Sequence, residues 1–192
     1  MNRLDDVDRK IITQLQKDGR TTFEALGKLT GYTSMGAKKR MKKLLDEGSI
    51  TISALLNVKQ LEFSAALVFL EMEHSESLRQ LLERFRDCPR VVQIFTALGG
   101  YNLIAIIVAE NRDVLESISL EKCSLRSGRG IRRSEFYPIG NIDYTPFLFI
   151  REYLTHKERT ITPCGVDCRP CPRYLSKKCV GCPTANYYQG PL

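Results

Sequence analysis

The residues that decide the fold are Thr33-Ser-Met-Gly-Ala-Lys-Lys-Arg-Met-Lys-Lys-Leu-Leu-Asp-Glu-Gly48. Apolar residues recur in it at helical spacing, namely Ala37, Met41, Leu44 and Leu45. The other side of the same helix carries lysines, namely Lys38, Lys39, Lys42 and Lys43, with Arg40 at the edge. Such a helix fits the major groove of a duplex beside the phosphates. A solvated lysine face on any surface helix shows the same pattern, so the preceding residues decide between the two interpretations.

Two shorter helices are predicted before this basic helix. The first has apolar residues at helical spacing, namely Leu4, Ile11, Ile12 and Leu15. Asp5 stands in its N-cap position, and Gly19 ends it. Thr21-x-x-Glu24 has the form of a capping box and opens the second helix, which Gly31 ends. Two short capped helices before a basic one form a helix-turn-helix, which favours the groove-binding interpretation.

The same residues resemble the DNA-binding half of a known family. The likeness lies in Leu4-Asp5-x-x-Asp8-x-x-Ile11-Ile12-x-x-Leu15-x-x-Asp18-Gly19-Arg20 and in Gly31-Tyr32-Thr33 through Arg40, then Leu44 and Gly48-Ser49-Ile50. These stretches resemble the Lrp/AsnC (feast-famine) transcription regulators. The resemblance implies a winged helix-turn-helix over residues 1–60 that binds double-stranded DNA. The contact residues expected on this basis are Ser34, Met35, Lys38, Lys39, Arg40, Lys42 and Lys43.

Residues 61–145 predict an alternating sheet with two helices, which makes the fold class α+β. Strands are expected at 65–73, 91–98, 103–109 and 131–139. One helix opens at Ser75 or Ser77 and ends at Pro89, and another is capped by Asp113-x-x-Glu116. The order βαββαβ is ferredoxin-like and puts both helices on one face of the sheet. A second copy is the simplest cover for the other face, so we expect a homodimer or a higher homo-oligomer.

The turn Gly99-Gly100-Tyr101-Asn102 joins two of these strands. It matches a glycine-containing turn in the effector-binding half of the same regulators. In that family, small effectors such as amino acids bind between subunits near this turn. Glycine lets a backbone approach a ligand closely, and exposed amides can hold a carboxylate. A tight hairpin without any ligand explains the same residues equally well.

Five of the seven cysteines crowd into the tail at residues 164–192, which a linker at 146–163 joins to the sheet. Two Cys-x-x-Cys pairs are typical of a tetrahedral zinc site. The favoured ligands are Cys168, Cys171, Cys179 and Cys182, with Cys164 as the alternative. A typical member of the family lacks this tail, so it is an addition whose metal holds a small cysteine-rich lobe together.

Other interpretations of the cysteines stay open. The spacing Cys164-x3-Cys168-x2-Cys171 also fits three corners of an iron–sulfur cluster, and disulfides rank last in a chain without an export signal. Zinc ranks above iron–sulfur. Cys88 and Cys123 stand alone in the middle of the chain and are interpreted as packing residues rather than ligands.

Composition restricts the function classes. The 192 residues are 43% hydrophobic with a net charge of +7, which favours an anionic partner. Neither an export signal nor a membrane span is recognised, so we expect a cytoplasmic protein with no membrane partner. No nucleophile–base pair or nucleotide-binding motif is present, so we expect no enzyme. The alternatives are a tetrapyrrole-modifying enzyme on a similar fold and a metal or redox sensor with an iron–sulfur cluster.

Overall fold

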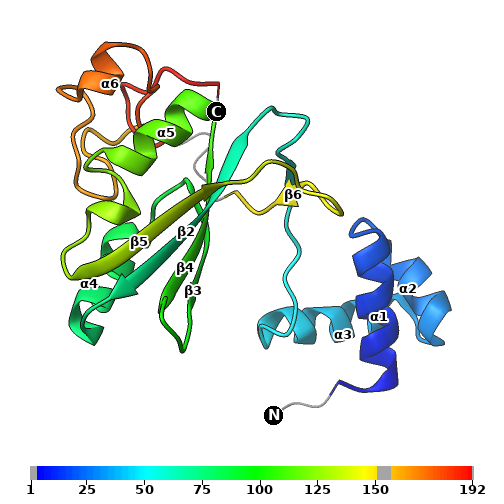
Figure 1. Ribbon diagram of the computed structural model, residues 1–192. Coiled ribbons are helices and arrows are strands. Elements are labelled where there is room, and N and C mark those ends of the chain that lie inside the picture. Colours follow the sequence, from blue (N-terminus) through cyan, green and yellow to red (C-terminus); the bar gives the residue numbers. More distant parts are fainter. Residues whose placement is uncertain (1–3, 151–156, 192) are drawn as a thin grey trace. The chain divides into compact units, whose positions relative to one another are not determined.

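The chain forms two compact units, residues 1–54 and 55–192, as a computed structural model shows (Figure 1). The structure describes residues 4–150 and 157–191. The expected domains had their first boundary after residue 60 and a separate tail. In the structure the division falls six residues earlier, and the tail belongs to the same compact unit as the sheet.

Three helices make up the first unit, namely α1 (Asp6–Lys17), α2 (Phe23–Thr30) and α3 (Ser34–Asp46). Asp5 caps α1 and accepts the backbone N–H three residues on, at 2.9 Å. Thr33 caps α3 in the same way, at 3.1 Å. The cap of α2 is Thr22 rather than the predicted Thr21, because the Thr21 hydroxyl instead donates to the carbonyl of Asp18 at 2.7 Å.

The core of this unit lies where the three helices meet. Its buried members are at most 2% exposed, namely Ile11, Leu26, Ala37 and Leu44. Of the predicted stripe of α3, Ala37 and Leu44 therefore lie in the core and Met41 packs at its border, whereas Leu45 is half-buried outside this cluster. In the described residues 4–54 these helices are the only regular elements, so the expected wing forms no strand pair within this unit. The strand after α3, β1 (Leu56–Asn57), instead pairs with β6 (Phe147–Leu148) in the second unit.

The second unit contains the predicted ferredoxin-like sheet. Its strands are β2 (Ser64–Met72), β3 (Val91–Thr96), β4 (Leu103–Ala109) and β5 (Ile131–Pro138). They lie in the order β3-β4-β2-β5, and every pair is antiparallel. Helices α4 (Ser75–Phe85) and α5 (Arg112–Leu120) connect them, followed by a 3₁₀ turn (Leu125–Ser127). The βαββαβ order is thus confirmed. Asn111 caps α5 in place of the predicted Asp113, because its side chain accepts the Val114 N–H at 2.9 Å.

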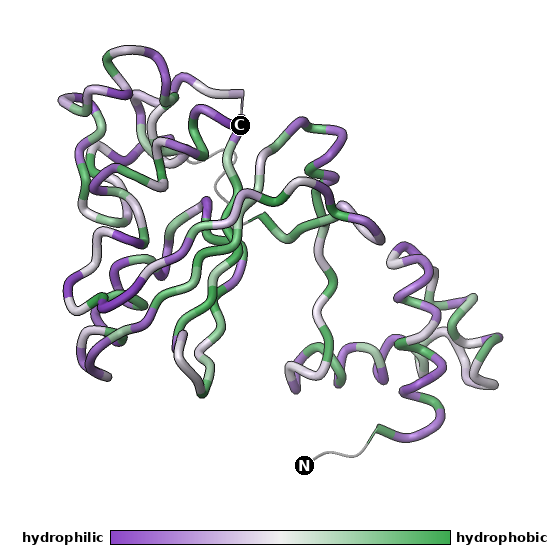
Figure 2. Tube along the Cα trace, in the orientation of Figure 1, coloured by the Kyte–Doolittle hydropathy of each residue, from purple (hydrophilic) through white to green (hydrophobic). Residues whose placement is uncertain are grey.

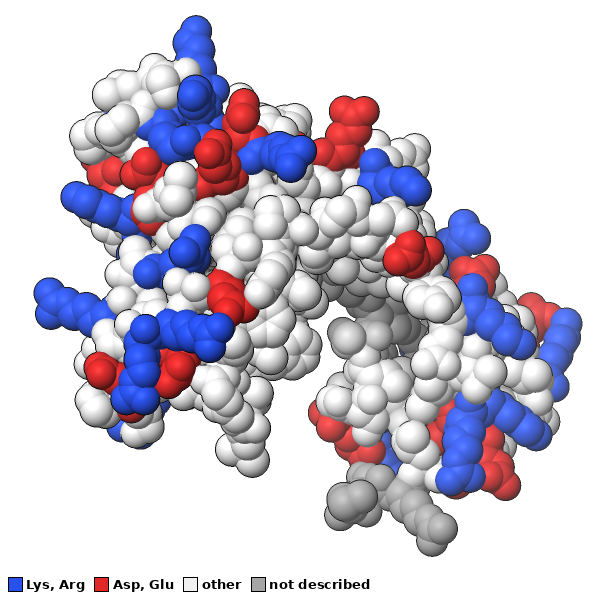
Figure 3. Space-filling model, viewed as in Figure 1, with Lys and Arg blue, Asp and Glu red and all other residues white. Residues whose placement is uncertain are grey.

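The two faces of the sheet differ. The side chains that face α4 and α5 form the main core, which includes Val68, Leu70 and Leu103. The opposite face carries an apolar row, in which Phe95 pairs with Ile104 and Ile104 with Phe69. Figure 2 shows the inner strands β2 and β4 as largely hydrophobic and much of β5 as hydrophilic, and Figure 3 shows the β3–β4 hairpin almost without charged side chains.

The tail packs against the main core beside α5 (Figure 1). Its one short helix, α6 (Pro172–Leu175), follows Cys171. Cys179 is a buried member of the main core, and Cys164 and Val180 pack at its border. Among the helices in the described residues, none is both long and apolar enough to cross a membrane.

Candidate functional site

The exposed side of α3 carries the predicted DNA-contact residues. Ser34, Lys38 and Lys39 are exposed, and Met35 at the first turn is 71% exposed. The Lys38 ammonium lies 6.0 Å from the centre of the Phe23 ring. Within the described part of the chain, neither Lys38 nor Lys39 has an ion-pair partner, so both positive charges are available to an anion. In Figure 3 the visible face of this unit shows Lys and Arg side chains among acidic ones.

The lysines of the second half of α3 are paired along the helix. Lys42 lies 2.5 Å from Asp46, and Lys43 lies 3.7 Å from Glu47. Both pairs are largely solvent-exposed. Because exposed pairs one helical turn apart contribute only about 0.3–0.5 kcal/mol, they give way readily to a phosphate. The first half of α3 therefore presents the stronger unpaired charge.

Arg40 takes a different place from the lysines. Its side chain is 25% exposed and pairs with Asp5 and, at 3.2 Å, with Asp8. The Asp8 backbone N–H, together with the Arg40 guanidinium, holds the pKa of the Asp5 carboxyl below its usual value. Arg40 therefore joins α3 to the start of α1, whereas the predicted contact lysines point to solvent.

The turn at Gly99–Asn102 is open around its glycines. A methyl group added at Gly99 or at Gly100 would meet no heavy atom within 4 Å, and neither glycine has a positive φ. Asn102 is different, because its side chain is engaged with the neighbouring strand. Its amide oxygen accepts the Met72 N–H at 2.8 Å, and its amide nitrogen donates to the Met72 carbonyl at 2.9 Å. The Asn102 side chain thus fixes the turn to β2.

Tyr101 points from this turn to an acidic group on the sheet. Its hydroxyl donates to Glu135, as does the hydroxyl of Tyr137. Burial and the Glu135 carboxylate raise the pKa of Tyr101 to about 12, and the two phenols lower the pKa of Glu135. Arg133 lies 2.8 Å from Glu135 and 5.1 Å from the centre of the Tyr101 ring. The turn therefore lies beside a charged aromatic cluster, which sequence pattern does not reveal because its members are far apart in the chain.

The predicted metal ligands divide into two groups. Cys168, Cys179 and Cys182 are buried and line one cavity of about 50 Å³, whereas Cys171, at the N-cap of α6, is absent from its lining. Burial raises the pKa of Cys168 to about 11 and raises that of Cys182 as well. No three Cys, His, Asp or Glu side chains in the described residues are grouped to hold a single metal ion.

The same cavity is lined by three more cysteines, namely Cys88, Cys123 and Cys164. Cys88 follows α4 and Cys123 follows α5, so they come from the sheet part of the unit rather than from the tail. Burial raises the pKa of Cys88 to about 12 and also raises that of Cys123. The interpretation of these residues as isolated packing residues missed this proximity, because no sequence spacing links them to the tail.

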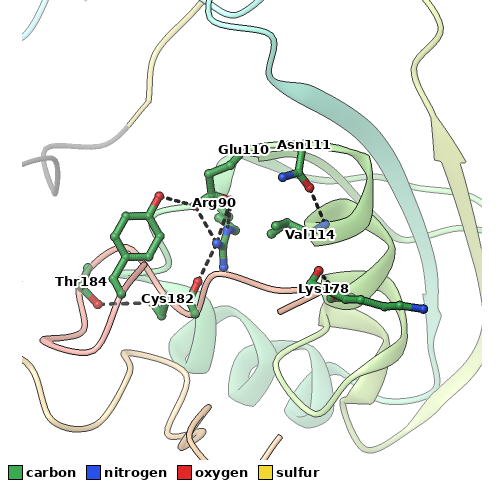
Figure 4. A network of polar contacts seen from close by, with 10 residues as sticks. Arg90, Glu110, Asn111, Val114, Lys178, Cys182 and Thr184 are labelled. Atoms are coloured by element: carbon green, nitrogen blue, oxygen red, sulfur yellow. Dashed lines mark hydrogen bonds and ion pairs between the residues drawn. The ribbon is translucent and has the colours of Figure 1, made fainter. Parts of the chain in front are cut away.

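A buried ion pair fastens the tail to the sheet. Arg90 donates to Glu110 at 2.7 and 2.8 Å and to the Gly181 carbonyl at 2.7 Å (Figure 4). Tyr188, near the end of the tail, donates to Glu110 at 2.7 Å. Arg173 adds a second link from the tail to α5, through Ser117 and Glu116 at 2.6 Å each.

Comparison with known proteins identifies the helix-turn-helix and the sheet. The AsnC-type helix-turn-helix domain matches residues 4–45, and the Lrp/AsnC ligand binding domain matches residues 65–137. Neither match reaches the cysteine-rich tail. The "Uncharacterized HTH-type transcriptional regulator YezC" of Bacillus subtilis is 33% identical over 114 residues, which are 59% of this chain and 81% of that protein. The chain belongs to the Lrp/AsnC family of transcriptional regulators, a family of regulators rather than enzymes.

Two further relatives illustrate the range of the family. The "HTH-type transcriptional regulator FL11" of Pyrococcus furiosus is 27% identical over 115 residues, covering 59% of this chain and 76% of that protein. A crystal structure of transcriptional regulator NMB0573 from Neisseria meningitidis in complex with L-Met has a TM-score of 0.65 at 21% identity. The match covers 74% of this chain and 94% of that chain. At this identity the likeness shows the fold.

Proposed function

We propose that this Lrp/AsnC regulator contacts double-stranded DNA through the exposed face of α3. The observation that carries the proposal is the pair Lys38 and Lys39, which are exposed and unpaired among the described residues on a helix whose other side is packed. Ser34 and Met35 lie at the helix start, where side chains reach base edges in a helix-turn-helix. Lys42 and Lys43 lie one turn farther along the same face, where they contact phosphates. Arg40 supports the helix from inside the unit.

The first prediction concerns the salt dependence of this binding. Removing Lys38 and Lys39 together by alanine substitution should weaken binding to the protein's own promoter and lower the slope of log K against log salt by about 2, since each phosphate contact contributes about 0.9. Fluorescence anisotropy over a salt series measures this slope. Lys10→Ala with Lys17→Ala is the matched control, because it removes two exposed charges from α1 of the same unit. Equal slopes for both double variants would contradict the proposal.

We further propose that the effector is a small amino acid-like molecule bound at the turn of Gly99–Asn102. The open space around the two glycines and the nearby Tyr101, Arg133 and Glu135 supply backbone amides, an aromatic face and charges for an amino acid. L-Met in the neisserial structure supports this class of ligand. Calorimetric titration with a panel of amino acids tests it. Binding that survives Gly100→Phe unchanged would exclude the turn.

The protein is proposed to act as a homodimer or a higher homo-oligomer. The row Phe95, Ile104 and Phe69 on the sheet face opposite the helices supports this assembly, because its outermost member is 49% exposed. Large apolar side chains on an open sheet face are typical of a surface that a second copy covers. Light scattering coupled to gel filtration measures the assembly.

The tail is proposed to bind a metal through cysteine thiolates, and the Cys-x-x-Cys spacing taken alone favours zinc. Buried thiols from a segment that has little core of its own support this proposal. Of the predicted ligands Cys168, Cys171, Cys179 and Cys182, with Cys164 as the alternative, all but Cys171 line the shared cavity. Metal analysis of protein purified without oxygen tests for zinc.

A further inference from the structure

Six of the seven cysteines surround one cavity, and they come from two parts of the fold. Cys88 and Cys123 lie at the ends of the helices that cover the sheet. The other four belong to the tail, namely Cys164, Cys168, Cys179 and Cys182. A zinc site built by the tail alone would not require thiols from the sheet part. We propose that this cavity is a metal centre built jointly by the sheet and the tail, that it binds an iron–sulfur cluster, and that Cys171 is not a ligand.

The chemistry of the lining restricts the ligand to a thiophilic metal group. Beside the thiols, the lining is mostly apolar, with Phe85, Val91 and Ile107 among its members. It contains no carboxylate and no imidazole. Thiolates select zinc, copper(I) or iron–sulfur groups, whereas magnesium and calcium require oxygen ligands.

The arrangement favours a cluster over a single ion. Four thiolates on one zinc ion each lie about 2.3 Å from it, so the sulfurs must converge on a point. Here six thiols line the wall of a cavity of about 50 Å³, and none of the described residues form a group of three that could share one ion. A cubane [4Fe–4S] cluster instead receives each of four thiolates at a different iron, so the sulfurs stand apart around it. This inference rests on the proposed metal binding by the tail, and it changes both the ligand set and the expected metal.

Two of the sulfurs lie within hydrogen-bonding distance of a hydroxyl group. The Thr184 hydroxyl lies 3.4 Å from the sulfur of Cys182, and the Thr162 hydroxyl lies 3.2 Å from that of Cys164. Hydrogen bonds to sulfur stabilise bound thiolates and tune the potential of a cluster.

The charge on the cavity's thiols depends on whether a metal is bound. Arg90 lines the cavity, but it already pairs with Glu110 at 2.7 and 2.8 Å. Without a metal the thiols stay protonated, because a thiolate in an apolar cavity would be buried without compensation. A bound metal group displaces the thiol protons and compensates the thiolate charge.

The test is anaerobic reconstitution of the full chain with iron and sulfide, followed by visible absorbance and by analysis of iron and sulfide. The wild-type protein should turn brown and hold iron and sulfide in equal amounts. Cys171→Ser should keep the full cluster content. Cys179→Ser should lose most of it, and Cys88→Ser with Cys123→Ser should lower it at least twofold. Circular dichroism of each variant shows whether it remains folded.

Three results would overturn the proposal. The first is a colourless wild-type protein that takes up zinc alone. The second is a loss in Cys171→Ser equal to that in Cys179→Ser. The third is an unchanged cluster content in the folded double variant of Cys88 and Cys123. DNA affinity is measured on the same samples, so failure of the metal centre is distinguished from failure of DNA binding.

Discussion

Single residues explain why the first unit packs as it does. Gly27 is buried inside α2, where glycine costs about 1 kcal/mol relative to alanine in intrinsic helix propensity. The structure shows the compensation, because a Cβ atom there would lie 2.7 Å from the carbonyl oxygen of Tyr32. Gly27 therefore lets the turn before α3 approach α2 closely.

Gly27→Ala should destabilise the first unit by about 1–3 kcal/mol, because the obstructing atom belongs to the backbone and cannot rotate away. Gly36→Ala is the matched control on α3, since its Cβ would meet the Tyr32 side chain at 3.1 Å. That ring is 49% exposed and is free to move, so the control should change stability by less than about 1 kcal/mol. Urea unfolding measures both values. A Gly27→Ala protein as stable as the control would disprove the role of close approach.

Because Arg40 pairs with Asp5, we expect the free energy of unfolding to depend on pH. The pKa of Asp5 is lowered in the folded state, so its contribution is present above the unfolded pKa of about 4 and is lost as the pH falls through the folded value. Arg40→Gln removes part of this lowering but keeps the larger part, the Asp8 N–H. The stability difference between wild type and Arg40→Gln should therefore shrink as the pH falls below about 4. Urea midpoints at several pH values measure it, and a constant difference would contradict the pairing.

At the scale of elements, the tail depends on its links to the sheet. Arg90 and Glu110 are 9% and 1% exposed, at the ends of neighbouring strands, and they hold Gly181 and Tyr188 of the tail. Burying a charge pair is favourable only when its geometry and hydrogen bonds are complete, as they are here. The pair thus links two residues of the tail to the ends of two strands.

Glu110→Gln should destabilise the second unit by about 3–5 kcal/mol, because it leaves the Arg90 charge buried without a partner. Glu116→Gln is the matched control, since it breaks the ion pair between Glu116 on α5 and Arg173 of the tail. The Glu116 side chain is 57% exposed. That change should cost no more than about 1 kcal/mol. Limited proteolysis of the tail and thermal unfolding report both effects. Equal effects of the two substitutions would refute the importance of burial.

At the scale of the whole molecule, the open sheet face predicts assembly. Phe95→Glu should shift the protein toward monomers, because it places a charge within the apolar surface that a second copy is proposed to cover. Leu175→Glu is the control, since Leu175 on α6 is 68% exposed and lies on the tail. Light scattering during gel filtration distinguishes dimer from monomer. A Phe95→Glu protein of unchanged mass would show that another surface mediates assembly.

Much of this protein follows from local sequence pattern. The three helices, the βαββαβ order and the exposed lysines of α3 were predicted, because helical spacing, caps and strand alternation act between residues close in the chain. The cap positions shifted by one or two residues at Thr22 and Asn111, since neighbouring polar residues compete for the same N–H groups.

What tertiary structure decided is which distant residues meet. Arg40 pairs with an acidic residue at the start of α1 instead of joining the lysine face. The Asn102 side chain hydrogen-bonds to the backbone of Met72 on the neighbouring strand. Cys88 and Cys123 line the same cavity as four cysteines of the tail, whereas Cys171 does not line it. Spacing along the chain cannot reveal such meetings, because they depend on how elements pack around a shared core. Sequence alone therefore determined the elements and the family, whereas packing determined which side chains form each site.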